Sequence, residues 1–341
     1  MTVISGRICY IHAGTHKTAS TYIQSRLIQN RKILLGEGII YEFPGRDGRK
    51  HKPLLKAINR SNWKAWHTYL ERFQQRRQHL LMSAEQFTRP LCDTRHLARI
   101  AKILLKHDYQ LHVVVFIRPQ LEYINSRYVH TLRRLYHSLT LEEYVSQSMQ
   151  NGSNDVFNYN QYFEPLLSSG IPFTFIPFSR RYGDPFLQLM SALQLSTDLS
   201  YKPAAPGSEN VQPGTKGVWL SRLVVQTIEA LGLKGRSLKQ TSKMVRQVAE
   251  REGWHEQRYF GFSEELAERT INHYQAGNDA FSQRVWAVPW QQMFGSQVPT
   301  QSIYSPACLS EADRMNQLAD QIVRALAKRN PKLANALNTL A

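Results

Sequence analysis

Acidic residues are scarce in this chain. Its 341 residues include 26 Asp and Glu against 43 Lys and Arg, so its formal net charge at pH 7 is +17. An excess of this size points to an anionic partner, which is a nucleic acid, a membrane surface, or a small substrate bearing phosphate, sulfate or carboxylate groups. The charge alone does not choose among these three classes.

Long apolar runs and paired cysteines are also missing. No stretch approaches the roughly 20 apolar residues of a membrane-spanning helix, and residues 1–14 lack the basic lead and apolar run of a secretory signal. Cys9, Cys92 and Cys308 form no CxxC pair, so neither a zinc ribbon nor a disulfide framework is predicted. We therefore expect a cytoplasmic protein, with Cys9 as a small buried hydrophobe.

Short apolar runs alternate with helical patterns over the first 200 residues. The runs cover 7–12, 38–43, 80–83, 111–117 and 173–178. The helical patterns cover 20–35, 63–77, 94–107, 119–136 and 184–195. Strands that are apolar on nearly every residue are typical of parallel sheets covered on both faces. The alternation predicts an α/β protein, with three layers around a central, mainly parallel sheet.

The character of the sequence changes after residue 200. A segment rich in Pro, Gly and Asn, 201–214, reads as a loop. Only helical patterns follow it, at 216–232, 238–252, 263–277 and 310–328. Ser310 and Asp313 have the spacing of a capping box at the start of the last helix. We expect an α/β core over 1–200 and a helical region over 201–341.

The turn after the first strand has the residues of an anion-binding loop. It reads GTHKTAST at 14–21, where Gly14 permits a tight turn and Lys17 carries an ammonium group. Thr18, Ser20 and Thr21 add hydroxyl donors at the start of a helix, whose backbone N–H groups and dipole favour anions. A Walker loop has four residues between its first glycine and a Gly-Lys pair. Here only Thr15 and His16 separate Gly14 from Lys17, so a triphosphate is disfavoured.

An arginine follows the most apolar strand. Arg118 ends the run 111–117, and Pro119 is suited to be the first residue of the next helix. The carboxyl ends of strands in open α/β sheets are where ligands bind. Ser126 lies eight residues after Arg118, a little over two helical turns, so the two side chains can share a phosphate.

These two motifs together resemble the sulfotransferases that use 3′-phosphoadenosine 5′-phosphosulfate (PAPS), in particular their bacterial carbohydrate-type branch. The resemblance covers about the first 200 residues and implies a P-loop-like fold. It implies that the loop residues Lys17, Thr18, Ala19, Ser20 and Thr21 bind the 5′-phosphosulfate. It also implies that Arg118 and Ser126 bind the 3′-phosphate. Ala19 stands where this family often has glycine, which suits the loop if φ at Ala19 is negative.

Sulfuryl transfer requires a cation at the departing phosphate and a base for the acceptor proton. Lys17 is the predicted cation, and no metal site is predicted because no ligand cluster with metal spacing occurs. Glu85 is the first choice of base, because it follows a buried strand on the same sheet edge and resembles an acidic element of the family. Alternatively, Glu85 only stabilises a helix capped by Ser83. His16 is the second choice of base, whereas His12 is expected inside the strand.

Two weaker predictions concern residues elsewhere in the chain. Asn210 and Lys216 could close over the adenosine, although a plain connecting loop is the simpler interpretation. Arg133, Arg134 and His137 could line an acidic acceptor site or form a solvated basic face.

The sequence therefore predicts an enzyme that transfers a sulfo group from PAPS to a hydroxyl, leaving adenosine 3′,5′-bisphosphate. The expected acceptor is a surface polysaccharide, a lipopolysaccharide or a glycolipid, and one form of this prediction is an anionic acceptor. We expect residues 201–341 to shape the acceptor site. A peripheral position at the inner face of the membrane is a further expectation. The alternatives are a nucleotide-dependent kinase with a degenerate P-loop and a nucleic-acid-binding protein. Neither a magnesium carboxylate at the end of 111–117 nor a nucleic-acid-binding motif is present.

Overall fold

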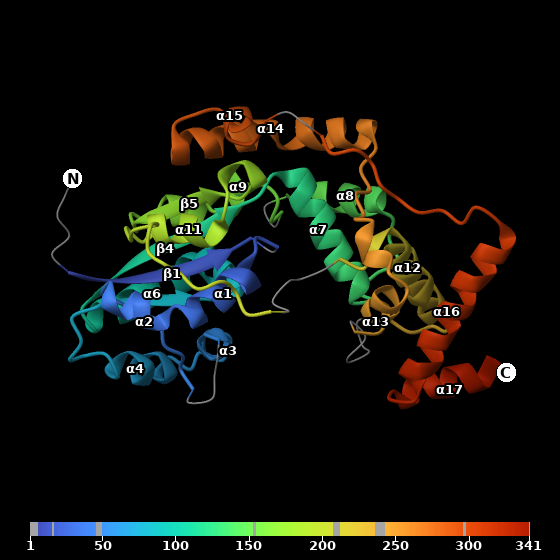
Figure 1. Cartoon of the computed structure of the whole chain (residues 1–341), viewed down its shortest axis with the longest axis horizontal. Helices are drawn as coiled ribbons and strands as arrows, with labels where there is room; N and C mark the ends of the chain where they lie inside the picture. Colours follow the sequence, from blue (N-terminus) through green and yellow to red (C-terminus); the bar gives the residue numbers. More distant parts are fainter. Residues whose placement is uncertain are drawn as a thin grey trace. The chain divides into compact units, whose positions relative to one another are not determined.

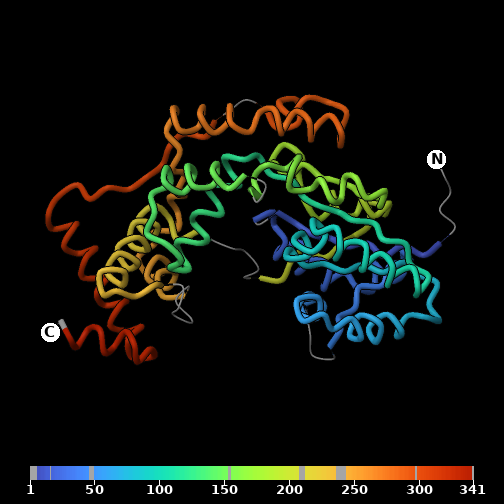
Figure 2. Tube along the Cα trace, turned by 180° about the vertical axis from the view of Figure 1, so that it is seen from behind, coloured from blue at the N-terminus to red at the C-terminus, as the bar shows by residue number. Residues whose placement is uncertain are grey.

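The chain forms two compact units, which we describe separately (Figures 1 and 2). The computed structural model describes residues 6–15, 17–45, 50–152, 155–206, 212–235, 243–295 and 298–340. The sheet unit consists of Met1–Pro119, Ser153–Glu209 and Tyr274–Ser296. The helical unit consists of Gln120–Gly152, Asn210–His273 and Gln297–Ala341. This division by contacts does not follow the expected boundary at residue 200, because each unit is built from three separate segments.

The sheet unit contains a five-stranded parallel sheet. Its strands are β1 Arg7–Gly14, β2 Ile39–Ile40, β3 His79–Ser83, β4 Tyr109–Ile117 and β5 Phe173–Pro177. Their order in the sheet is β2-β3-β1-β4-β5, and every neighbouring pair is parallel. The predicted α/β fold is confirmed, and each of the five predicted runs overlaps a strand. Only β2 is much shorter than its run, since it ends at Ile40.

Helices cover both faces of this sheet, which makes three layers. The chain leaves β1 toward one edge and leaves β3 toward the other, so right-handed crossovers put α1 (Ser20–Gln29) and α6 (Thr94–Lys106) on opposite faces. On the first face, α1 and α11 (Pro185–Ala192) share a buried apolar cluster with β1, β3 and β4. On the second face, α6 packs against β4 and is flanked by α4 (Lys64–Glu71) and α10 (Glu164–Leu167).

A buried polar network closes the first face at the end of α1. The Arg26 guanidinium pairs with Asp184 and lies 4.1 Å from the centre of the Phe186 ring. The Asn30 side chain donates to the Lys202 carbonyl at 2.9 Å and accepts from the Lys202 N–H at 2.7 Å. These bonds explain why the predicted helix 20–35 divides at Asn30 into α1 and α2 (Arg31–Gly36).

The helical unit has its own apolar core. The unit includes the helices α7 Gln120–Arg133, α8 Leu141–Met149, α12 Gly214–Ala230, α13 Met244–Arg251, η6 Trp254–Glu256, α16 Leu309–Ala327 and α17 Pro331–Leu340. Buried leucine, isoleucine and valine side chains of α12 and α16 form the centre of this core. The helix α14, Glu264–Trp286, begins in this unit and ends in the sheet unit. Among the described helices, none is both long and apolar enough to cross a membrane.

Several helices and one cap differ from the sequence prediction. The additional helices are α3 Lys52–Asn59, η1 Glu85–Phe87, α5 Thr88–Leu91, α8, α9 Tyr159–Tyr162, α10, η3 Arg180–Tyr182, η6, α15 Trp290–Phe294 and α17. The prediction of a capping box at Ser310 is wrong, because α16 begins at Leu309 and its N-cap is Cys308. A complete capping box occurs instead at α8, between Thr140 and Glu143. The helix expected from Pro119 begins at Gln120.

Removing the buried cation of the α1 network should destabilise the sheet unit. Arg26→Ala would remove the cation paired with Asp184 and one of the two donors to the Lys202 carbonyl, which we expect to lower the free energy of unfolding by about 2–3 kcal/mol. Urea unfolding followed by tryptophan fluorescence measures this loss. Arg284→Ala, which breaks a half-exposed pair with Glu164, is the control and should cost less than about 1 kcal/mol. Equal losses in the two variants would contradict the role of burial.

Candidate anion-binding site

Three of the expected site residues, Lys17, Glu85 and Arg118, follow the carboxyl ends of three adjacent strands. The strands β3, β1 and β4 lie side by side at the centre of the sheet and end at Ser83, Gly14 and Ile117. Since the connections from β1 and β4 run toward opposite edges, the end of β1 is a topological switch point. The sequence after each of these three strands therefore meets at the position where open α/β sheets bind their ligands.

The loop from Gly14 to Ala19 has an unusual backbone. Lys17 has φ +73° and Ala19 has φ +54°, so two residues with side chains adopt left-handed conformations within three positions. Such alternation turns successive N–H groups to one side and makes an anion-binding concavity. The expectation of a negative φ at Ala19 is wrong. An L-residue pays roughly 1–2 kcal/mol for this conformation, and strain of this kind is concentrated at functional sites.

Hydrogen bonds to Thr88, which follows β3, and to the backbone of β4 hold the loop in place. The Thr88 hydroxyl donates to the Gly14 carbonyl at 2.7 Å and accepts from the Gly14 N–H at 3.1 Å. The Thr15 hydroxyl donates to the carbonyl of Phe116 in β4 at 3.1 Å. Within the loop, the Thr18 hydroxyl donates to the Thr15 carbonyl at 2.8 Å. A Cβ at Gly14 would lie 2.9 Å from this Thr18 hydroxyl, which explains the need for glycine there.

The Glu85 carboxylate lies directly on the loop. One oxygen accepts from the Lys17 backbone N–H at 3.1 Å, and the other accepts from the Ser20 hydroxyl at 3.3 Å. Glu85 opens the short helix η1, whose N-cap is Ala84. Ser83 therefore does not cap this helix, and its hydroxyl contacts His12 instead.

Arg118 approaches the loop from the other side. Its guanidinium donates to the Lys17 carbonyl at 3.1 Å and lies 5.8 Å from the centre of the Phe178 ring. The Arg118 carbonyl accepts from the Tyr159 hydroxyl at 2.6 Å. Lys17 thus has Glu85 on its N–H and Arg118 on its carbonyl, and the structure brings together three residues that lie far apart in the sequence.

The remaining predicted residues have different positions. Thr21 is exposed on the first turn of α1, and His16 and Asn210 lie outside the described residues. Ser126 is buried in α7 of the helical unit, so its pairing with Arg118 stays a prediction. The Lys216 ammonium pairs with Glu311 at 2.9 Å, and a role over the adenosine would require this pair to open.

The basic cluster at the end of α7, formed by Arg133, Arg134 and His137, is only partly solvated. The His137 ring stacks on Tyr144 with ring centres 5.3 Å apart, and its Nε2 contacts the Thr131 hydroxyl at 2.8 Å. Burial lowers the pKa of Arg133, whereas Arg134 is exposed. The interpretation as a plain solvated face therefore does not fit His137.

His12 lies beneath the loop and was expected only as a strand residue. It is fully buried in β1, its Nδ1 contacts the Ser83 hydroxyl at 2.8 Å, and its Nε2 has no partner among the described residues. Burial lowers the pKa of His12 to about 4, although the Glu85 carboxylate opposes the shift. Thr88 was not identified from the sequence as a site residue. Its position three residues after Glu85 is the one signal in the sequence that places it near the loop.

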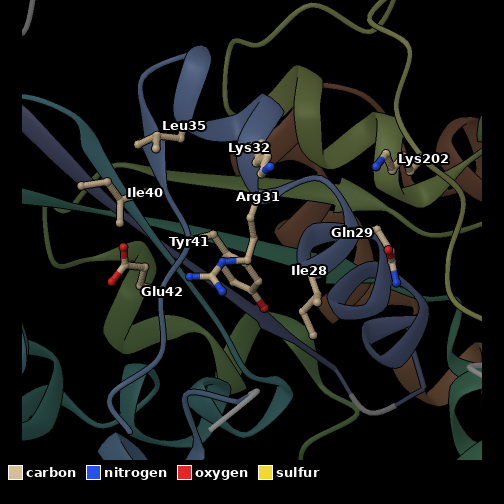
Figure 3. A pocket seen from close by; sticks show the side chains of 9 residues that line it. All are labelled: Ile28, Gln29, Arg31, Lys32, Leu35, Ile40, Tyr41, Glu42 and Lys202. Carbon is tan, nitrogen blue, oxygen red and sulfur yellow. The ribbon is translucent and has the colours of Figure 1, made fainter. Parts of the chain in front are cut away.

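A second feature of the sheet unit is a basic hollow beside β2 (Figure 3). Its volume is about 480 Å³, and Ile28, Gln29, Arg31, Lys32, Leu35, Ile40, Tyr41, Glu42 and Lys202 line it. The carboxylate of Glu42 is paired with Arg72 at 2.9 Å. The cations Arg31, Lys32 and Lys202 form no ion pair within the described part of the chain. The hollow is therefore strongly positive, with apolar walls.

No family model and no curated protein matches this chain. Across the described residues, no group of three or more His, Cys, Asp or Glu side chains is arranged to hold a metal ion. The resemblance to sulfotransferases thus depends on the motif residues themselves.

Acid should destabilise the sheet unit through two buried histidines. Burial lowers the pKa of His12 and of His51 to about 4, against about 6.5 in the unfolded chain. Because the unfolded state binds more protons between these values, stability falls as the pH decreases from 6.5 toward 4. Each histidine should account for about 1.5 kcal/mol between pH 6.5 and 5. Urea unfolding of the wild type, His12→Asn and His51→Asn at both pH values measures this contribution. Each variant should lose less stability between pH 6.5 and 5 than the wild type, and an equal loss would contradict the prediction.

Proposed function

We propose that this chain is a sulfotransferase that uses PAPS as donor and a carbohydrate hydroxyl as acceptor. The observation that carries the proposal is the strained loop at residues 14–19, which opens α1 at the switch point of the sheet. Lys17 and Ala19 are left-handed there, and the Lys17 N–H and the Ser20 hydroxyl donate to the Glu85 carboxylate. A loop that holds a carboxylate in this way has the donors that a phosphosulfate needs.

The neighbouring residues support an anionic donor larger than a single phosphate. Arg118 lies on the Lys17 carbonyl and presents a guanidinium at the same sheet edge, where it is suited to a bidentate phosphate contact. In our proposal Arg118 binds the 3′-phosphate together with Ser126. Ser20 and Thr21 add hydroxyl donors around the 5′-phosphosulfate, as the motif implies, and the Thr18 hydroxyl would have to leave the Thr15 carbonyl to join them.

The chemistry requires one cation and one base. PAPS supplies the sulfo group, whose sulfur forms a bond to the acceptor oxygen while its bond to the phosphate oxygen breaks, leaving adenosine 3′,5′-bisphosphate. Lys17 stabilises the charge on the departing phosphate. Glu85, on the loop, accepts the acceptor proton, with His16 as the alternative base. Most of the rate enhancement would come from positioning and from charge stabilisation.

An anionic acceptor is supported by the basic hollow. Its three unpaired cations and its apolar walls suit a glycan that carries carboxylate, phosphate or sulfate groups. The acceptor would be a surface polysaccharide, lipopolysaccharide or glycolipid, and residues 201–341 would shape the rest of its site. A cytoplasmic location, peripheral to the inner face of the membrane, belongs to the same proposal.

A kinase is the second candidate, because Glu85 is a carboxylate beside the loop and could hold Mg²⁺. ATP with Mg²⁺ is therefore a necessary arm of any binding experiment.

Adenosine 3′,5′-bisphosphate should stabilise the wild-type protein. At about a hundredfold excess over Kd, we expect a rise in melting temperature of about 5 °C. Lys17→Ala and Arg118→Ala should each abolish this rise, because each removes a cation from the site. Lys102→Ala, on the exposed face of α6, is the control and should keep it.

Two results would contradict the proposal. One is a wild-type protein that ignores adenosine 3′,5′-bisphosphate but is stabilised by ATP with Mg²⁺, which would favour the kinase. The other is a response that persists in both Lys17→Ala and Arg118→Ala.

Charge removal in the basic hollow should affect the acceptor alone. In sulfation assays with an anionic oligosaccharide, Lys202→Ala should raise KM about threefold to fivefold, which is the contribution of one exposed ion pair. The value of kcat and the affinity for adenosine 3′,5′-bisphosphate should stay unchanged. Lys102→Ala again serves as the control, and an unchanged KM in Lys202→Ala would remove the hollow from the acceptor site.

A further inference from the structure

The Glu85 carboxylate uses the donors that the loop would offer to a bound anion. Its two oxygens accept from the Lys17 N–H and from the Ser20 hydroxyl, at 3.1 Å and 3.3 Å. Both donors belong to the segment that opens α1. We propose that Glu85 is an internal competitor, which occupies the anion-binding loop until the phosphosulfate of the donor displaces it. This inference rests on the proposed function and adds a control step to the same site.

The position of Glu85 is fixed by its backbone and by its neighbours. The Ala84 N–H donates to the His12 carbonyl at 3.1 Å, which extends the pairing of β3 with β1 to the residue before Glu85. The fully buried Phe87 and the Thr88 hydroxyl on Gly14 hold the other end of η1. The fold itself therefore brings the carboxylate to the loop, and a change in the Glu85 side-chain torsions is what would move it away.

Glu85 and a phosphosulfate cannot both occupy these donors. Two anions a few ångströms apart repel each other, and both would use the Lys17 N–H and the Ser20 hydroxyl. Binding of the donor must therefore break both hydrogen bonds of Glu85 with the loop. A ligand that has to displace an internal group shows a weaker apparent affinity, by the fraction of molecules in which the site is open.

Displacement would also prepare the base. The released carboxylate loses two hydrogen bonds and gains an anionic neighbour, and both changes increase its affinity for a proton. Donor binding would thus convert Glu85 from a ligand of the loop into the acceptor of the substrate proton. Catalysis would then require the donor to bind before the proton is transferred.

The experiment is isothermal titration of the full chain with adenosine 3′,5′-bisphosphate and, separately, with inorganic pyrophosphate. Glu85→Gln removes the competing charge, and Glu85→Ala removes the side chain beyond Cβ. We expect both variants to bind each ligand about tenfold more tightly than the wild type while losing sulfation activity. Glu71→Gln removes one exposed carboxylate of α4 and is the control for net charge, with affinities within twofold of the wild type.

Each outcome decides the proposal. Equal or weaker binding in both Glu85 variants, with melting temperatures that show a folded protein, overturns the competition. Wild-type binding of adenosine 3′,5′-bisphosphate in that case leaves the sulfotransferase proposal intact. If pyrophosphate binds and adenosine 3′,5′-bisphosphate does not, the proposed function fails, whereas tighter pyrophosphate binding in Glu85→Gln still supports the competition. Absence of binding by every variant overturns both.

Discussion

The turn between β1 and α1 is the constraint on which the sheet unit depends. Two residues with side chains, Lys17 and Ala19, are held in left-handed conformations there, and this geometry is unfavourable for an isolated chain. The surrounding structure offsets the cost through hydrogen bonds from Thr15 to β4 and between Thr88 and Gly14. Since these partners follow β3 and lie within β4, the loop can form only when the three central strands are in register. The same hydrogen bonds thus stabilise both the central strands and the candidate site.

Parallel strands explain why so few residues suffice to build this site. Each strand end contributes one group to the same edge of the sheet: the loop after β1, Glu85 after β3 and Arg118 after β4. Under the proposed function, an anion that displaces Glu85 would meet the Lys17 N–H, the Ser20 hydroxyl and the Arg118 guanidinium. Part of the excess of basic residues is thus concentrated at two places in the sheet unit, namely this edge and the basic hollow.

The sequence predicted the sheet well because its strands are buried on both faces and carry continuous apolar runs. It also predicted that Lys17, Glu85 and Arg118 share one sheet edge, because this follows from strand ends alone. It could not predict the conformation of Ala19, since an alanine carries no signal for a positive φ. The break at Asn30 and the partner of Thr88 were equally hidden, because they depend on bonds to residues 172 and 74 positions away. Local patterns do not record such contacts.

The discontinuity of the sheet unit has a consequence for its synthesis. Its aromatic cluster includes Phe163 and Phe175 from the middle of the chain and Phe281 from α14, and the Trp286 indole donates to the Phe175 carbonyl at 2.9 Å. A nascent chain that has reached residue 200 holds all five strands but lacks these covering residues. The unit can therefore close only after about 90 further residues, 201–290, have left the ribosome. Until then β5 exposes phenylalanine side chains, which makes chaperone binding or aggregation of the unfinished polypeptide the expected hazard.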